Sequence, residues 1–411
     1  MDKLALRRRH ISTILRYSFV SVLGFFHLKN LFRKFVIKSK PVFKEDVSIF
    51  KNNRSLLVFP NIPWDYRWQR AQQIFSRLGE KSYNVFYLSS ITSTNEYILE
   101  VSKGVYEIHV KASIETDVLR DLSLNDEIAK EIFESIKRLI GRYLDSKDLT
   151  FVLHPVWSKV VQKFKDRKVV YDMMDLYSGF SEAKPELVIA EEQLVKESKL
   201  VLTTADNLYK YAKRFNSNVE MVRNGCDFER FSDIKKNGVL DSLDDRPIVG
   251  YFGALNDWLD VDALEYAVKE NRDKYFVLIG SINTGKVKKL YRYSNVFFFG
   301  EVNHSELGGY LAYFDVCTIP FILNDLIKST NPVKFYEYIA SGKPVVSARL
   351  PELEIYKDIC CLYDSSEDFS KCIYKGLHDE DKEIAKKRIE IAKENSWEKR
   401  IEKLHNIIQS L

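Results

Sequence analysis

Residues 329–346, STNPVKFYEYIASGKPVV, carry the boundaries of one helix and decide the fold prediction. Asn331 can cap a helix, Pro332 suits its first turn, and Gly342 can end it. The pattern therefore predicts a helix over 332–341 that is followed at once by a strand. The free amide groups at the start of such a helix and the positive end of its dipole can together hold a diphosphate.

Two charged residues inside this stretch point to the same chemistry. Lys334 and Glu337 are three positions apart, so they share one face of the helix. An ammonium group there can pair with phosphate, and a carboxylate one turn further can accept hydrogen bonds from ribose hydroxyls. The same spacing also fits a solvent-exposed Lys–Glu pair on an ordinary capped helix, and the sequence leaves both interpretations open.

Around this helix, short apolar runs alternate with helical stretches along most of the chain. Such alternation is typical of parallel βαβ units whose sheet is covered by helices on both faces. We predict an α/β fold of two Rossmann-like, doubly wound domains, with ligand in a cleft where the carboxyl ends of the two sheets face each other. The expected strands are 55–60, 83–89, 149–153, 168–173, 200–203 and 219–222 in the first domain, and 247–252, 275–280, 295–299, 314–319 and 344–348 in the second.

Composition changes suggest where these domains begin and end. The polar stretch 232–246 has no periodicity and is interpreted as a linker. From residue 397 onward, apolar side chains recur at steps of four and three, which predicts a helix with one apolar stripe that packs back toward the N-terminal domain. The expected parts are an extension at 1–45, domains at 46–240 and 241–390, and a C-terminal helix at 391–411.

The extension is strongly basic. Residues 1–40 hold ten Lys and Arg but a single acid, Asp2, whereas the whole chain of 411 residues has a net charge of +5. Its longest uncharged apolar part, 17–26, is shorter than the roughly 20 residues that span a bilayer. We predict helices that lie on an anionic membrane surface, at the cytoplasmic face of the cell membrane. A signal or spanning segment and an ordinary basic helix packed on the body remain alternatives.

The cysteines indicate neither a metal site nor a disulfide framework. The five of them form no CxxC pair and no recurring spacing, and a reducing compartment fits this pattern best. Glycine and proline are too few for a low-complexity or fibrous protein. No nucleic-acid-binding motif accompanies the basic N-terminus, so we expect no nucleic acid partner.

The stretch 331–348, NPVKFYEYIASGKPVVSA, resembles the donor-binding signature of retaining GT-B glycosyltransferases of family four. In that family a glutamate at the position of Glu337 holds the ribose. Further segments occur in the family's order: VRNGCD at 222–227, IVGYFG at 248–253 and LTTADNL at 202–208. Together with PWD at 63–65, RWQR at 67–70 and YDMMD at 171–175, these motifs look most like bacterial cell-surface polysaccharide transferases of the teichuronic-acid type.

The resemblance implies roles for individual residues. Many members have an acid eight positions before the ribose-binding glutamate, where this chain has Ser329. The histidine of a His–Pro pair, here His154, lies beside donor and acceptor in related transferases. The implied donor-binding residues are Asn224, Gly253, Ser329, Thr330, Asn331, Lys334 and Glu337.

The residues at strand ends add candidates for acceptor chemistry. Asp172 and Asp175 end an expected strand and could orient an acceptor hydroxyl or act as a base. Arg67 and Arg70 could bind phosphate, or they could be a solvated first helical turn. The two aspartates lack the Asp-x-Asp spacing of metal-dependent transferases, so we expect no metal. His154, Lys334 and Asp175 are the candidate catalytic residues.

These observations predict a glycosyltransferase that moves a sugar from a nucleotide-diphosphate sugar to a hydroxyl of a cell-surface polysaccharide or a lipid-linked glycan. No cofactor is expected besides the donor substrate, and the resemblance alone implies retention of configuration. Two other functions remain open: a catalytically inactive nucleotide-sugar-binding subunit of a membrane assembly complex, and a sugar-nucleotide epimerase of the same fold. A Rossmann-type redox enzyme is disfavoured because no GxGxxG follows an expected first strand.

Overall fold

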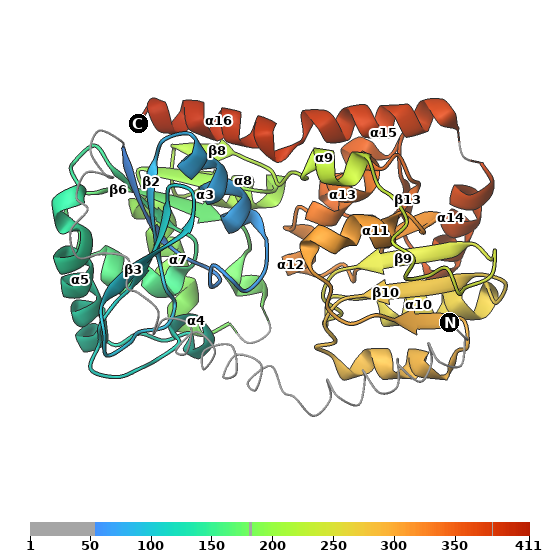
Figure 1. The fold of residues 1–411 in the computed structure, drawn as a ribbon, viewed down its shortest axis with the longest axis horizontal. Coiled ribbons are helices and arrows are strands. Elements are labelled where there is room, and N and C mark those ends of the chain that lie inside the picture. The colour runs from blue at the N-terminus through green and yellow to red at the C-terminus, as the bar shows by residue number, and fades with distance from the viewer. Residues whose placement is uncertain (1–53, 181–182, 380) are drawn as a thin grey trace. The chain divides into compact units, whose positions relative to one another are not determined.

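A computed structural model describes residues 54–180, 183–379 and 381–411. The extension expected at 1–45 lies outside these residues. The described chain divides into two compact units (Figure 1). The N-terminal unit contains the described residues up to Arg223 and then Arg400–Leu411, and the C-terminal unit contains Asn224–Lys399.

The N-terminal unit is built on an eight-stranded sheet with the order β3-β4-β2-β1-β5-β6-β7-β8. All neighbouring strands are parallel except the edge pair β3 and β4, which is antiparallel. Every residue of β1, β2, β4, β5 and β7 is buried, as expected for strands covered on both faces. The strands are β1 (Ser55–Phe59), β2 (Asn84–Leu88), β3 (Tyr97–Ser102), β4 (Val105–His109), β5 (Leu149–Val152), β6 (Lys168–Met173), β7 (Leu200–Thr203) and β8 (Val219–Met221).

Helices connect these strands and cover the sheet (Figure 1). For example, α3 packs on β2 and β4, α7 on β6, and α8 on β7 and β8. The helices are α3 (Arg70–Glu80), α4 (Val118–Asp121), α5 (Asp126–Ile140), α6 (Ser158–Val161), α7 (Pro185–Glu197) and α8 (Asp206–Lys213). The apolar stripe of α16 (Trp397–Gln409), expected from the sequence, is buried at Ile401, Leu404 and Ile408.

The C-terminal unit repeats the arrangement with a six-stranded parallel sheet of order β11-β10-β9-β12-β13-β14. Its strands are β9 (Ile248–Phe252), β10 (Tyr275–Ile279), β11 (Val296–Phe298), β12 (Val316–Ile319), β13 (Val345–Ala348) and β14 (Cys361–Tyr363). Its helices are α9 (Phe228–Ser232), α10 (Val261–Glu270), α11 (Leu307–Leu311), α12 (Asp325–Lys328), α13 (Val333–Ala340), α14 (Ser366–His378) and α15 (Lys382–Glu394). In this unit α13 packs against α9 and α15, and α10 packs against α14.

The two doubly wound α/β sheets confirm the predicted fold class, but the boundary between the units differs from the expected one. The chain passes from one unit to the other at residues 223–224, not near 240. The stretch 232–246, interpreted as a linker, instead packs on the C-terminal unit. There Leu240 is buried, and the amide of Gly238 donates to the hydroxyl of Tyr313 at 2.8 Å.

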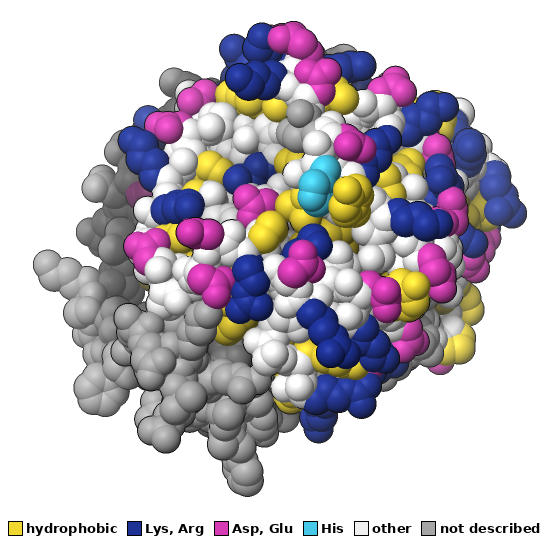
Figure 2. Space-filling model, turned by 90° about the vertical axis from the view of Figure 1, so that its right-hand side faces the viewer, with side chains coloured by type: hydrophobic (Ala, Val, Ile, Leu, Met, Phe, Trp, Pro, Cys, Tyr) yellow, Lys and Arg dark blue, Asp and Glu magenta, His cyan; other side chains and the backbone are white. Residues whose placement is uncertain are grey.

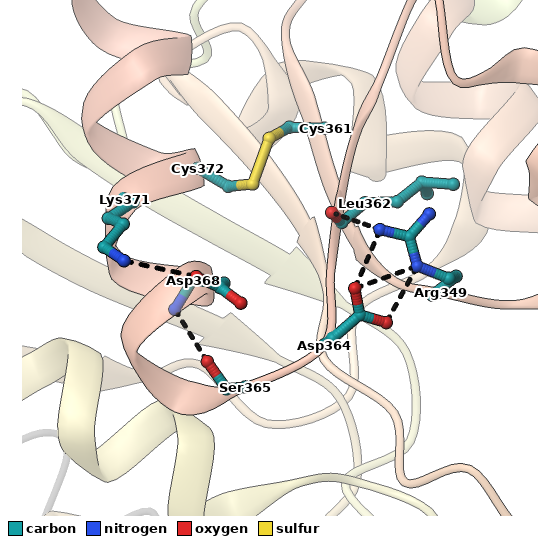
Figure 3. The surroundings of a disulfide bond; sticks show 8 residues. All are labelled: Arg349, Cys361, Leu362, Asp364, Ser365, Asp368, Lys371 and Cys372. Carbon is teal, nitrogen blue, oxygen red and sulfur yellow. Dashed lines mark hydrogen bonds and ion pairs between the residues drawn. A yellow bond between two sulfur atoms is a disulfide. The ribbon is translucent and has the colours of Figure 1, made fainter.

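A disulfide joins Cys361 and Cys372, so the expectation of a chain without disulfides is wrong (Figure 3). β14 and the helix that follows it bring these two residues, 11 positions apart, to a Cα–Cα distance of 5.7 Å. That proximity arises from the strand-to-helix turn and leaves no signature in cysteine spacing. The other three cysteines are free thiols and are buried. Because disulfides persist mainly in oxidising environments, the cysteines no longer favour a reducing compartment.

The surface is charged but of mixed sign on the face that Figure 2 shows, where acidic and basic side chains alternate among the described residues. Apolar side chains occur there singly or in small groups. Within the described ranges, none of the helices combines the length and the apolar character needed to cross a bilayer.

Candidate functional site

The topology of the C-terminal sheet defines where a ligand can bind. The chain runs outward from β9 to β10 on one side, and β12 lies on the other side of β9. Ligands of open α/β sheets bind beyond the carboxyl ends of the strands at such a switch point. Gly253 directly follows β9, and the segment after β12 leads to α13. The stretch that decided the fold prediction therefore lies at the expected edge of the sheet.

α13 begins one residue later than expected and without a side-chain cap. Pro332 occupies the N-cap position, so the prediction that Asn331 caps the helix is wrong. The amide groups of Val333 and Lys334, in the first turn, have no carbonyl partner within the helix. They point out of its N-terminus, where the helix dipole favours an anion. Gly342 follows the last turn with a φ of 74°, as expected for a helix end.

The side chain of Lys334 lies half-buried over two aromatic rings. Its Nζ is 4.7 Å from the ring centroid of Phe321 and 5.6 Å from that of Tyr251. Among the described residues it has no hydrogen-bond or ion-pair partner. Burial lowers the pKa of Lys334 to about 8, against the opposing effect of the Glu337 carboxylate. An ammonium that is desolvated and unpaired in this way is suited to bind an anion.

Gly253 makes room for this ammonium. Its φ of 136° is a conformation that side chains rarely adopt, and a Cβ atom there would lie 3.0 Å from Cε of Lys334. The backbone of the turn after β9 can therefore approach both the lysine and any phosphate that the lysine binds.

Glu337 is buried and hydrogen-bonded to a histidine that sequence reasoning missed. Its Oε1 lies 3.1 Å from Nε2 of His304, and its residue is only 5% exposed. The His304 ring in turn packs edge-on against Phe231, with centroids 5.5 Å apart. His304 thus holds one carboxylate oxygen in place. No sequence signal could indicate the pair, because its members are 33 positions apart.

Asn224 and Asn331 are engaged with each other. The amide of Asn224 donates to Oδ1 of Asn331 at 3.0 Å, and its side-chain nitrogen donates to the Asn331 carbonyl at 2.7 Å. Nδ2 of Asn331 donates to the Tyr336 hydroxyl at 3.1 Å and to Glu352 at 3.0 Å. These contacts fix the segment that precedes α13, so both asparagines act on the site through the backbone they hold.

Ser329 and Thr330 also lie in this segment. Ser329 is buried at the end of α12, and the hydroxyl of Thr330 donates to the Leu326 carbonyl at 2.9 Å. The structure therefore brings the predicted donor-binding residues of the C-terminal unit together around the start of α13.

The N-terminal sheet has its own switch point, between β1 and β5, and His154 follows β5 there. Its Nδ1 accepts a hydrogen bond from the amide of Val156 at 3.1 Å, which places the ring proton on Nε2. Burial lowers the pKa of His154 to about 4, so the ring is neutral near pH 7. In this form Nε2 donates a hydrogen bond and has no lone pair free to act as a base.

Asp175 lies just beyond β6 in a buried environment that raises its pKa to about 6. Within the described part of the chain its carboxylate has no hydrogen-bond partner.

Glu191, which sequence reasoning missed, is fully buried nearby, and burial raises its pKa to about 7. Its two oxygens accept from the Tyr171 hydroxyl at 2.8 Å and from the amide of Tyr177 at 3.2 Å. The Tyr177 ring lies edge-on to His154, with centroids 4.7 Å apart.

Arg70 and Asp172 neutralise each other, so neither is available to an acceptor or a phosphate. Nε and Nη2 of Arg70 bind the two carboxylate oxygens of Asp172 at 2.9 and 2.8 Å, and both residues are at least 95% buried. The two residues therefore form a structural ion pair, in place of the predicted roles of Asp172 as a base and Arg70 as a phosphate ligand.

Arg67 is half-buried, with its guanidinium 4.6 Å from the ring centroid of Tyr66. No group of three or more candidate metal ligands occurs in the described ranges.

Comparison with known proteins agrees with this geometry. Residues 246–379 match the family model of glycosyl transferases group 1. This segment is therefore similar to the glycosyl transferases of that group. It includes Gly253, the whole of α13 and the Lys334–Glu337 pair.

A curated relative and several solved structures are similar over longer parts of the chain. A Bacillus subtilis protein named as a glycosyltransferase of teichuronic acid biosynthesis is 25% identical over 202 residues, which are 45% of this chain and 51% of the relative. The chain thus matches about half the length of that relative.

Two solved structures are similar in fold to most of the chain. Sucrose-phosphate synthase from Thermosynechococcus elongatus has a TM-score of 0.72 and 16% identity over 87% of this chain and 98% of its own. The Anabaena protein HepE, solved with UDP and glucose, has a TM-score of 0.62 and 14% identity over 87% of this chain and all of its own. These matches confirm the predicted GT-B fold, whereas retention of configuration stays a prediction.

Proposed function

We propose that the protein transfers a sugar from a nucleotide-diphosphate sugar to a hydroxyl of a glycan or lipid-linked acceptor. The observation that carries this proposal is the unpaired ammonium of Lys334, a residue of the first turn of α13 that lies one turn before the buried carboxylate of Glu337. A diphosphate and a ribose, joined as in a nucleotide, match these three features in charge and order.

In this proposal the main catalytic effect is stabilisation of the leaving group. As the bond from sugar to diphosphate breaks, negative charge grows on the departing phosphate oxygen. Lys334 and the α13 amides offset that charge in a desolvated setting, where preorganised donors are most effective. Because they supply the positive charge, the proposed reaction needs no divalent ion.

The N-terminal unit supplies candidates for the acceptor side of the reaction. His154 donates a hydrogen bond from Nε2, so we assign it to orienting a sugar hydroxyl and not to removing a proton. Asp175 has a pKa raised by burial to about 6 and remains largely ionised at pH 7, so it is the better candidate base. In the retaining version of the mechanism, which the resemblance implies, the acceptor hydroxyl attacks on the face that the diphosphate leaves.

A thermal-shift screen tests the donor assignment. We expect a UDP-, GDP- or dTDP-sugar to raise the melting temperature, because a ligand at 100 times its Kd stabilises the native state by about 2.7 kcal/mol. A CMP-sugar has a single phosphate and is the matched control, expected to give little shift. Glu337→Gln should weaken the binding of whichever nucleotide sugar gives the shift by roughly 10- to 100-fold, as expected for the loss of a charged hydrogen-bond acceptor.

The outcomes of that screen separate the alternatives. An equal response to the CMP-sugar would contradict the diphosphate site. A shift without any sugar transfer or donor hydrolysis would favour a nucleotide-sugar-binding subunit, and conversion of the donor alone to an isomer would favour an epimerase.

We also propose that residues 1–40 attach the protein to an anionic membrane surface, from their excess of Lys and Arg. Deleting them should release the protein from liposomes containing anionic lipid without lowering the melting temperature of the remaining chain. Liposomes of neutral lipid are the control. Binding that persists after the deletion would contradict this role.

A further inference from the structure

Glu191 is a buried carboxylate that the proposed mechanism does not use. It lies on α7 with no exposed surface, and among the described residues it forms no ion pair with a lysine or arginine. A charged group without an opposite charge is costly to bury. The groups that Glu191 does bind therefore indicate why a carboxylate stands at this position.

Both oxygens of Glu191 accept hydrogen bonds from the chain in and after β6. Oε1 accepts from the hydroxyl of Tyr171, within β6, at 2.8 Å, and Oε2 accepts from the amide of Tyr177 at 3.2 Å. Tyr177 begins the short turn Tyr177–Gly179 that follows this strand. One side chain thus ties both the strand and the turn to the same point on α7.

The turn contacts His154 through the ring of Tyr177. The two rings meet edge to face, with centroids 4.7 Å apart and planes inclined at 76°. The amide of Val156 binds Nδ1 of His154, and the Tyr177 ring limits how the imidazole can tilt about that bond. α7 also packs against Pro155–Trp157, the turn that directly follows His154. The same helix therefore contacts both segments that hold the imidazole.

Asp175 belongs to the segment that Glu191 holds. It lies between Tyr171 and Tyr177 in the chain, and Glu191 binds both of these residues, so the segment is restrained at each end. Burial raises the pKa of Glu191 to about 7, and the charge of Asp175 contributes in the same direction. The two carboxylates therefore lie close enough to interact.

We propose that Glu191 is a positioning residue for sugar transfer, whose carboxylate holds residues 171–177 so that His154 and Asp175 keep their places. The inference rests on the proposed transferase function and adds to it a residue that acts through others. A restraint of this kind matters because misplacing a reacting group by about 1 Å can lower the rate about 100-fold.

A direct role of Glu191 as the base fits less well. It is fully buried, and both of its oxygens already accept hydrogen bonds. Glutamine is neutral but can keep both contacts, because its oxygen can accept from the Tyr177 amide while its nitrogen donates to the Tyr171 oxygen. Positioning therefore survives Glu191→Gln, whereas a base would be lost.

Histidine NMR on the full-length protein tests the restraint without any substrate. An aromatic ring shifts the resonances of nearby protons, so the ring signals of His154, identified by their loss in His154→Gln, report on the place of Tyr177. We expect these signals to move in Glu191→Leu and in Tyr177→Ala but not in Glu191→Gln. Tyr177→Ala keeps the amide that Glu191 binds, so it remains informative if Glu191→Leu folds poorly.

Steady-state kinetics test the consequence for transfer. Glu191→Leu and Tyr177→Ala should lower kcat about 10- to 100-fold, and Glu191→Gln should stay within about threefold of the wild type. The KM for the donor should not change in any of them, because the donor-site residues lie in the C-terminal unit. The matched control is Glu192→Leu, which breaks an ion pair with Lys196 on the same helix and should alter neither measurement.

Two results would overturn the proposal. One is that the His154 signals stay in place in both Glu191→Leu and Tyr177→Ala, whatever the activity of the protein. The other is that Glu191→Gln turns over as slowly as Glu191→Leu, since Glu191 would then act through its charge. If the wild type transferred no sugar while the His154 signals moved as expected, the result would count against the proposed function and not against the restraint.

Discussion

Replacing Lys334 with methionine is expected to lower kcat for sugar transfer by about 10²- to 10³-fold, the usual effect of removing one preorganised donor from a developing oxyanion. The same variant should be more stable than the wild type. Methionine fills the space over the rings of Phe321 and Tyr251 without burying a charge. Loss of activity together with a gain in stability is the signature of a residue kept for function.

The pH dependence of stability provides an independent check on Lys334. The pKa of a free lysine is 10.5, and burial lowers that of Lys334 to about 8. Between these values the unfolded chain binds more protons than the native state, so the free energy of unfolding rises with pH. The gain, on the order of 3 kcal/mol, should be complete near pH 10.5 and absent in Lys334→Met.

A nearby lysine supplies the control for both measurements. Lys328 is exposed on α12, so Lys328→Met should change neither transfer nor the stability profile by much. Steady-state kinetics and urea unfolding at pH 7, 8, 9 and 10 provide the data. Wild-type turnover in Lys334→Met would contradict the leaving-group mechanism. If the free energy of unfolding had the same pH dependence in the wild type and in Lys334→Met, the ammonium would be hydrated and not buried.

The sequence predicts the parallel core of both sheets well, and for a physical reason. A strand that helices cover on both faces must be apolar throughout, as in SLLVF at 55–59 or YFVLI at 275–279, so it appears as a continuous apolar run. Three strands, β3, β4 and β14, are missed because they lack this pattern. In β3 only Ile98 is buried, β4 contains Glu107 and His109, and β14 has only three residues.

In the candidate site, too, the sequence predicts contacts between residues close together in the chain and misses those between distant residues. Lys334 and Glu337 are neighbours on one helix, so their spacing alone indicates a shared face. The partner of Glu337, His304, and the partner of Asp172, Arg70, are 33 and 102 positions away. Only the fold brings such residues together, and for Asp172 the partner changes the interpretation from a base to a structural ion pair.

Removing one member of that ion pair should have the largest effect on stability in the N-terminal unit. In Asp172→Ala the Arg70 guanidinium stays buried with its two strongest hydrogen bonds lost. Leaving a buried charge uncompensated costs about 3–5 kcal/mol, a large part of the roughly 5–15 kcal/mol that stabilises an ordinary domain. Urea unfolding, followed by the fluorescence of the tryptophans, should show a large fall in the midpoint.

The double variant Arg70→Met/Asp172→Leu separates a structural role from a catalytic one. It replaces both charges with apolar side chains of similar volume, so most of the lost stability should return, and transfer activity should return with it. The exposed pair Arg223–Asp206 is the matched control, because removing its carboxylate should cost at most about 1 kcal/mol. If Asp172→Ala folded normally but transferred no sugar, and the double variant were equally inactive, Asp172 would have to act on the acceptor itself, and the ion pair would be its resting state.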